Sequence, residues 1–512
     1  MKDDFDLTSI NYAKVKMPIQ ILLMGSATKL TGPKVKTVFV EDLPPEEAAK
    51  VAPEPSGLNN LGNTCYLNSV VQCMRNIPEF RSGLANLSSR NDNSHSTMAV
   101  EMSQRNRMFM TNLRDLYHSL ERTADAVSPT RFVMATKMSF PQFAQTGPQG
   151  QPMQQDAEEF YSGMLAIAAQ ETEGIDIIKK SFASVGKNVE EKDLHGSKNL
   201  IDAVFGIRME ETLTCDELPP PKDDDDSMVV EGSHEPPVKS YDLHRKMVCN
   251  IQGGSDSSAQ VNVSHIVEGI SLSLDGKLEK RSEILGRDAV WTSSRRIARL
   301  PPVLVVQFGR FFWKETPDSQ DHTGVKCKVM KPVAFSGTLD VYEFCTVEIQ
   351  KVLKKARDKA LKEEEDAITK KLKGQTDGSD DTAMDTSEEN KVASESMEED
   401  EELKAALAMS LQSEEKSETV GPGLPDDFQG KYEIFAVVTH KGRDADGGHY
   451  MGWVKAENQG DNKKIADTDE MNDDWFVFDD DEVSPCKTED VLKLKGGGDW
   501  HMSYLSFYRA KK

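Results

Sequence analysis

Hydrophobic and polar positions follow two different periods along the chain. Within residues 58–169 the apolar side chains recur at helical spacing, and over 67–74 they occupy positions i, i+3, i+4 and i+7. Pro78 ends that run. A second helix is predicted over 156–171, with Asp156 as its N-cap residue. This part of the chain is therefore expected to be mainly helical.

From about residue 205 the apolar runs become shorter and strand-like, and the same texture returns after residue 431. Between them, 348–430 starts with a highly charged helix candidate and continues into acidic sequence without the apolar side chains that a core needs. We therefore predict one α+β domain in two segments, 57–347 and 431–512, interrupted by a charged, largely disordered insertion.

The charge balance limits the partners. The formal net charge is −24, with 29% charged and 37% hydrophobic residues. An acidic chain of this kind is a poor partner for nucleic acid or an anionic membrane surface. The apolar stretches are also far shorter than the roughly 20 residues that span a bilayer. We expect neither nucleic acid nor a membrane as the main partner, and protein partners remain.

The cysteines indicate a reducing compartment. The chain has seven, sparsely placed, and no two of them have the C-x-x-C spacing of a zinc–thiolate site. The first residues are acidic and polar, unlike a secretory signal. We predict free thiols in a cytoplasmic protein, with nuclear access left open, and expect no cofactor and no structural metal.

Cys65, in the stretch GNTCYLNSV, lies where a loop runs into the first predicted helix. The free N–H groups and the positive dipole end of a helix N-terminus favour the thiolate form of a cysteine, which is the nucleophilic form. Asn63 or Thr64 is expected to cap this helix. A cysteine near a helix start is nevertheless more often a buried packing residue, so Cys65 needs partners to be called a nucleophile.

His449, in DGGHYMGW, is the best placed partner. Gly448 and the glycine before it permit unusual dihedral angles, so the chain can present the ring at a cleft, which Tyr450 would wall on one side. His440 is the competing histidine, but its strand setting favours a structural role. An apolar strand then leads into the acidic run 479–481, which is suited to deliver one carboxylate to the imidazole Nδ1. Acidic runs are usually solvated, and we expect that of at least one of these residues.

Several segments together resemble a known family. GLNNLGNTCYLNSVVQC at 57–73 and YEIFAVVTHKGRDADGGHYMGWV at 432–454 resemble the two signature boxes of ubiquitin-specific proteases. The intervening and final boxes are matched, in family order, by QQDAEEF at 154–160, LPPVLVVQFGRF at 300–311, WFVFDDDEV at 475–483 and SYLSFY at 503–508. The resemblance covers about 57–510 apart from the insertion.

The resemblance implies a papain-like cysteine protease fold with fingers, palm and thumb subdomains, cleaving after the C-terminal Gly-Gly of ubiquitin. It implies Cys65 as the nucleophile, His449 as the general base and Asp479 as the residue that orients the imidazole, with Asp480 assisting or substituting. Asn60 matches the family's side-chain donor to the oxyanion.

The same resemblance implies where the substrate is contacted. Gln155 and Asp156 lie in the box that commonly touches substrate, although Asp156 also reads simply as a helix cap. Gly448 and Tyr450 beside the histidine complete the predicted substrate-binding set. The family's zinc-binding finger cysteines are absent, so any finger region is expected to hold its shape by packing alone.

Two segments, one near each end of the chain, indicate one branch of the family. Segments 34–43 and 496–508 resemble the proteasome-associated branch, which carries an N-terminal ubiquitin-like domain. Residues 18–27 resemble the last strand of that domain, so we expect 1–30 to hold a remnant of it and 31–56 to be a linker. The resemblance implies the proteasome as a partner, with a truncated docking domain.

Inside the insertion, 398–415 resembles a ubiquitin-interacting motif. Leu403, Ala406, Leu407, Ser410 and Leu411 are spaced at i, i+3, i+4, i+7 and i+8. They are expected to give a helix one narrow apolar face that centres on Ala406. The alternative is an acidic helix that packs back on its own domain. For the whole chain the leading prediction is a deubiquitinating thiol protease acting on ubiquitin and polyubiquitin conjugates. The alternative is a catalytically silent, ubiquitin-binding regulator of the proteasome, and the sequence favours the enzyme because all the catalytic residue types are present.

Overall fold

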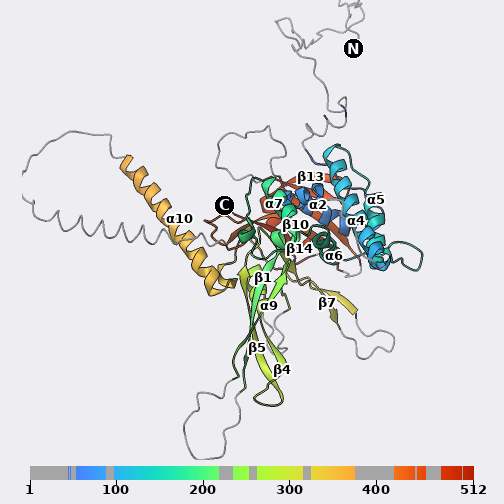
Figure 1. Ribbon diagram of the computed structural model, residues 1–512. Helices are drawn as coiled ribbons and strands as arrows, with labels where there is room; N and C mark the ends of the chain where they lie inside the picture. Colours follow the sequence, from blue (N-terminus) through green and yellow to red (C-terminus); the bar gives the residue numbers. More distant parts are fainter. Residues whose placement is uncertain are drawn as a thin grey trace, which may run out of the picture.

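The structure is a computed structural model with an α+β architecture (Figure 1). It describes residues 44, 47, 54–87, 97–217, 235–252, 262–314, 325–374, 420–443, 447–456, 474–498 and 500–511. The predicted remnant of a ubiquitin-like domain at 1–30, most of the linker at 31–56, and the ubiquitin-interacting helix predicted at 398–415 lie outside these residues. The described chain consists of a helical part, a large sheet, a projecting small sheet and one long helix.

The helical part follows the predicted periodicity. Its helices are α2 (Cys65–Arg75), α3 (Pro78–Ala85), α4 (Thr97–Glu121), α5 (Thr130–Ser139), α6 (Ala157–Glu171), α7 (Ile175–Ala183) and α8 (Leu200–Phe205). The prediction for α6 is confirmed: Asp156 is its N-cap, and the carboxylate accepts a hydrogen bond from the Glu158 backbone N–H. None of the described helices is both long enough and apolar enough to cross a bilayer.

The large sheet has the strand order β13-β12-β11-β10-β14-β6-β3, and β9 pairs with β10. Its strands are β3 (Met247–Cys249), β6 (Val303–Phe308), β9 (Thr338–Asp340), β10 (Lys431–Lys441), β11 (His449–Lys455), β12 (Asp474–Asp479), β13 (Glu482–Lys487) and β14 (Met502–Ala510). All neighbours are antiparallel except β3 and β6. Strands from both sequence segments thus form one sheet, as expected for a domain interrupted by an insertion.

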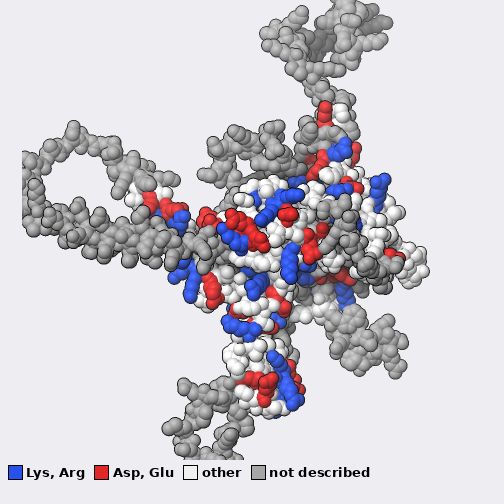
Figure 2. All heavy atoms as spheres, viewed as in Figure 1, with Lys and Arg blue, Asp and Glu red and all other residues white. Residues whose placement is uncertain are grey.

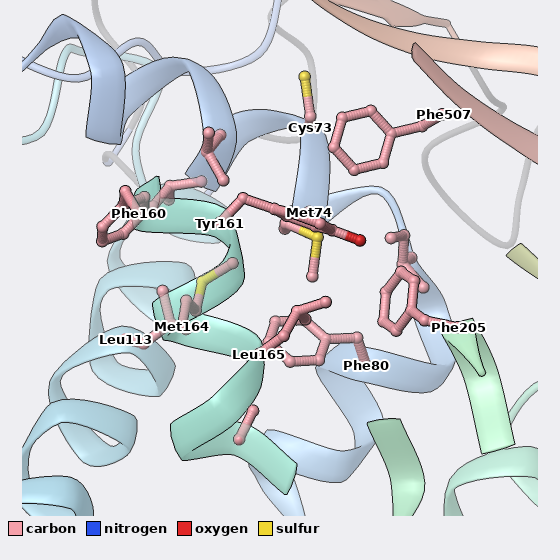
Figure 3. Packing of buried hydrophobic residues seen from close by; sticks show 14 of the residues in the cluster. Cys73, Met74, Phe80, Leu113, Phe160, Tyr161, Met164, Leu165, Phe205 and Phe507 are labelled. Carbon is pink, nitrogen blue, oxygen red and sulfur yellow. The ribbon is translucent and has the colours of Figure 1, made fainter. Parts of the chain in front are cut away.

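Helix α2 joins the helical part to the sheet. Each of its residues is buried, and Figure 3 shows Cys73 and Met74 among side chains from α6 and from β14, including Tyr161 and Phe507. Gly452 on β11 lets the helix approach, because a Cβ there would lie 3.1 Å from the Ser69 carbonyl oxygen. This close packing brings the start of α2 to the edge of β11.

The smaller sheet projects away from the rest of the chain (Figure 1). Its strand order is β2-β1-β5-β4, with β1 (Ile207–Cys215), β2 (Val238–His244), β4 (Asp275–Arg281) and β5 (Asp288–Arg299). Trp291 is fully buried in it, and the indole N–H donates to the Lys280 carbonyl at 2.9 Å. Further described elements are α9 (Ile266–Leu274), α12 (Thr488–Leu492) and a hairpin of β7 (Phe311–Lys314) and β8 (Val325–Lys328), which forms a two-stranded sheet of its own.

The segment predicted as an insertion, 348–430, has core residues at both ends. The long charged helix α10 (Val347–Gly374) projects from the domain in Figure 1, but its first part buries Leu353. At the other end Val420, Leu424 and Phe428 are buried in the same core cluster. Figure 2 shows both positively and negatively charged side chains along the visible part of α10, so this part has no surface of a single charge sign.

Candidate active site

Cys65 is the first residue of α2 and is only 2% exposed. Thr64 occupies the N-cap position but makes no side-chain cap hydrogen bond; its hydroxyl instead accepts from the Leu61 N–H at 3.0 Å. The backbone N–H groups of a first helical turn have no partners within the helix and carry a partial positive charge. The Cys65 sulfur therefore lies beside the partly positive N–H groups at the start of α2.

His449 lies at the start of β11, which packs against α2, and the imidazole is held between Cys65 and Asp479. Its Nε2 donates to Asp479 Oδ1 at 2.5 Å. The prediction that the carboxylate would contact Nδ1 was wrong, because Nε2 is the ring nitrogen beside Asp479. The hydrogen bond with Cys65, helped by that to Asp479, raises the pKa of His449 to about 9 against the opposing effect of burial. The imidazole thus favours its protonated form beside the sulfur.

Asp480 follows Asp479 directly but turns to different partners. Its φ of 55° is left-handed, and the side chain is buried. Oδ2 accepts from Asn60 Nδ2 at 2.7 Å and Oδ1 from Asn68 Nδ2 at 2.8 Å. Burial raises the pKa of Asp480, and these two hydrogen bonds oppose that rise. In the structure Asp479 is therefore hydrogen-bonded to the histidine, whereas Asp480 is hydrogen-bonded to two asparagines.

The Asn60 side chain is fixed at both ends of its amide. Its Oδ1 accepts from the backbone N–H of Gly62 at 2.9 Å and of Thr64 at 3.2 Å, which leaves the amide nitrogen to face Asp480. One N–H of that nitrogen is used by Asp480, and the other can point to a developing oxyanion above Cys65. The loop that carries Asn60 is itself anchored, because the Leu58 N–H donates to the Asp480 carbonyl at 2.8 Å.

Gln154 contacts the sulfur, and the sequence analysis missed it. Its Nε2 donates to Cys65 Sγ at 3.3 Å, whereas the predicted Gln155 points its amide at the Met153 carbonyl. The 152–154 segment is tied to the nucleophile loop, since Asn63 Nδ2 donates to the Pro152 carbonyl at 2.7 Å. The segment QQDAEEF at 154–160 begins with two adjacent glutamines. No feature of a single sequence indicates which of their side chains contacts Cys65.

The remaining predicted substrate residues are Asp156, Tyr450 and Gly448. Asp156 accepts from the Tyr504 hydroxyl at 2.7 Å in addition to capping α6. Tyr450 is buried, so its side chain forms part of the wall of the site and not part of its exposed rim. Gly448 has φ of 103°, the left-handed conformation expected from its place beside His449.

Three of these groups could also be considered as metal ligands. Among the residues that the structure describes, His449, Asp479 and Asp480 form the one group of three or more potential ligand atoms close together. Each already has a hydrogen bond to a protein group at 2.5–2.8 Å, which an ion would have to displace. The arrangement fits a catalytic acid–histidine pair better than a metal centre.

The raised pKa of His449 predicts the alkaline limb of the pH profile. The histidine stays protonated at neutral pH and loses its proton as the pH rises through about 9, so kcat/KM should fall in that range. Asp479→Asn removes a hydrogen-bonded anion and should move this limb to lower pH. The measurement is kcat/KM for a ubiquitin C-terminal amide between about pH 6 and 10. An identical limb in wild type and Asp479→Asn would contradict the assigned contact.

A buried cysteine at a helix start, hydrogen-bonded to an imidazole that donates to a carboxylate, is the constellation of a thiol hydrolase. The comparison with known proteins agrees. The family described as ubiquitin carboxyl-terminal hydrolase matches residues 56–508. The chain belongs to this family of cysteine deubiquitinases, which is the family of ubiquitin-specific proteases predicted from the sequence.

Relatives align over nearly the whole chain. It is 34% identical to "Ubiquitin carboxyl-terminal hydrolase 6" of Arabidopsis thaliana, over 100% of this chain and 89% of that protein. It is 30% identical to "Ubiquitin carboxyl-terminal hydrolase 6" of Schizosaccharomyces pombe over the same shares. Among solved structures, the "SAGA Ubp8/Sgf11/Sus1/Sgf73 DUB module bound to ubiquitin aldehyde" is similar with a TM-score of 0.48 and 17% identity, covering 89% of this chain and 70% of that one.

Proposed function

We propose that this protein hydrolyses the isopeptide bond that follows the C-terminal Gly-Gly of ubiquitin, with Cys65 as nucleophile. The observation that carries the proposal is the contact of one imidazole with both Cys65 and Asp479. In this assignment the α-helical part is the thumb, the large sheet the palm, and the β2-β1-β5-β4 sheet the fingers.

The reaction follows from the positions of the side chains. The Cys65 thiolate attacks the glycine carbonyl carbon, and the Asn60 amide receives the charge that moves to oxygen. The His449 imidazolium gives its proton to the leaving lysine amine, so the C–N bond breaks and a thioester remains. Water then attacks the thioester, His449 takes its proton, and ubiquitin leaves with a free carboxylate as the thiolate is restored.

The substrates are proposed to be ubiquitin and polyubiquitin conjugates bound to the proteasome, in the cytoplasm and the nucleus. The support is the resemblance of 496–508 to the proteasome-associated branch. Binding of chains by the helix at 398–415 is a further part of the proposal, and Ala406 would lie at the centre of its face.

The test is labelling with ubiquitin that carries a C-terminal electrophile, with and without purified proteasomes. We expect a covalent adduct on Cys65, located by mass spectrometry of the modified peptide. Labelling without proteasomes would mean a site that is competent on its own, and labelling only with them would mean activation by the particle. No adduct in either case would favour the silent, ubiquitin-binding regulator.

A further inference from the structure

The two chain segments that flank the turn between β10 and β11, residues 441–442 and 447–448, lie close together directly before His449. We call these two segments the neck. Gly442 and Gly448 have φ of 107° and 103°, and a Cβ on Gly448 would lie 2.2 Å from the Lys441 carbonyl oxygen. Lys441 pairs with His449 across the two strands. Any shift of this neck therefore moves the backbone of the proposed general base.

His440 closes one side of the neck from within β10. Its side chain is buried, and Nε2 is 2.9 Å from the Gly447 carbonyl oxygen, so Nε2 carries the proton and donates. Burial, with Lys328 nearby, lowers the pKa of His440 to about 3, and the ring is neutral at physiological pH. Its Nδ1 lone pair is then free to accept a hydrogen bond.

Lys328, the last residue of β8, closes the other side. Its Nζ lies 2.5 Å from His440 Nδ1, 3.2 Å from the His440 carbonyl oxygen and 2.7 Å from the Gly442 carbonyl oxygen. An ammonium has three N–H groups, and these acceptors use all of them. Among the residues that the structure describes, no carboxylate forms an ion pair with Lys328. Burial lowers the pKa of Lys328 to about 8.

The three N–H groups of this half-buried lysine go to a neutral imidazole and two carbonyls, and its Nζ lies 6.0 Å from the centre of the Phe311 ring. Satisfied donors are what a buried ammonium needs, since it is costly otherwise. Lys328 reaches both sides of the turn: Gly442 directly, and Gly447 through the His440 ring. We propose that Lys328 and His440 are positioning residues, and that their contacts with Gly442 and Gly447, the neck clamp, hold His449 in line with Cys65. This inference rests on the proposed function of Cys65 and His449.

The clamp is tested with Lys328→Met, which keeps the length of the side chain and removes all three donors. We expect kcat for a ubiquitin C-terminal amide to fall about 10- to 100-fold with KM little changed, because small misplacements of a catalytic group cost rate. His440→Gln should lower kcat in the same way. The kcat of the double variant should be no lower than that of the more impaired single variant, since both residues act through one set of contacts. Lys192→Met, which removes an exposed lysine paired with Glu190, is the matched control.

A second readout does not need ubiquitin. Alkylation of Cys65 by iodoacetamide, followed on its own peptide by mass spectrometry, reports how much thiolate the His449 imidazolium maintains at about pH 6. We expect this rate to fall in Lys328→Met and in His440→Gln, which also serves if the first variant does not fold. The titratable and charged groups around the clamp are His501, Arg310, Lys326 and Lys441.

The outcomes separate the two proposals. A wild-type alkylation rate in a folded clamp variant, or a change in KM alone, would overturn the neck clamp and leave the proposed function standing. Turnover that survives Cys65→Ala would overturn the proposed function, whatever the clamp variants show. A loss of kcat and alkylation together, with Lys192→Met unaffected, would support the clamp.

Discussion

Cys65→Ala is expected to reduce turnover of ubiquitin C-terminal amides to background, by about 10⁴-fold or more, while ubiquitin still binds. Loss of a nucleophile removes the covalent path and leaves only the contribution of binding and oxyanion donors. Binding should persist because Cys65 is buried, with only 2% of the residue exposed, so its side chain offers little surface to ubiquitin. The measurements are release of a fluorescent C-terminal amine and calorimetric titration with ubiquitin.

Cys73→Ala is the matched control for this prediction. Cys73 lies on the same helix, is fully buried, and its thiol contacts the Val437 carbonyl oxygen at 3.7 Å. Burial raises the pKa of Cys73 far above its ordinary value, so this thiol is inert. We expect a loss of about 1 kcal/mol of stability and full turnover. Retained turnover in Cys65→Ala would remove Cys65 from the nucleophile role, and equal loss in both variants would point to a folding defect.

The sequence was informative where the structure depends on local patterns. The apolar spacing over 67–74 predicted helix α2, all of whose residues are buried in the structure. Asp156 caps α6 because a carboxylate at that position satisfies a free N–H of the first turn. The acidic run after β12 was also recognisable, since an apolar strand that ends in aspartates delivers a carboxylate at the sheet edge. These features need only neighbours in the chain.

Orientation of side chains could not be predicted in the same way. The imidazole of His449 presents Nε2 to Asp479, not Nδ1, because the relative positions of α2 and β12 decide the rotamer. Gln154 and not Gln155 reaches Cys65 for a similar reason, since the direction of the 152–154 segment is set by the contact of Asn63 with Pro152. Both depend on packing between segments far apart in the chain: α2 against β12, and the loop before α2 against the 152–154 segment.

The neck clamp could not be predicted from any pattern in the sequence. Lys328 and His440 are 112 residues apart, and each residue type is most often explained without the other: a lysine at a strand end as solvated, and a histidine in a strand as a core residue. Only the tertiary structure, in which the end of the β7–β8 hairpin lies beside the end of β10, shows that one ammonium binds three acceptors. Sequence patterns identify residue types for chemistry, whereas positioning contacts of this kind emerge from the fold.

Asp480→Asn is expected to lower kcat by about 10²- to 10³-fold, the loss typical of a missing oxyanion donor, although the Asp480 carboxylate is hydrogen-bonded to Asn60 and Asn68 and not to His449. The carboxylate accepts from two amides, one on Asn60 and one on Asn68. An asparagine has a single acceptor oxygen, so one of the two donors loses its partner and the Asn60 amide is no longer fixed. A buried donor left unsatisfied should also cost about 1–3 kcal/mol of stability.

The comparison that decides the role of Asp480 uses its two neighbours. Asp479→Asn acts on the imidazole, so it should slow alkylation of Cys65 at about pH 6, whereas Asp480→Asn should leave that rate near wild type and lower only kcat. Asp481→Ala, in an exposed position of the same run, should change neither. If Asp480→Asn slows alkylation as much as Asp479→Asn does, Asp480 orients the histidine. If alkylation is unchanged and kcat falls, the two adjacent carboxylates have different roles: Asp479 positions the base His449, and Asp480 positions the oxyanion donor Asn60.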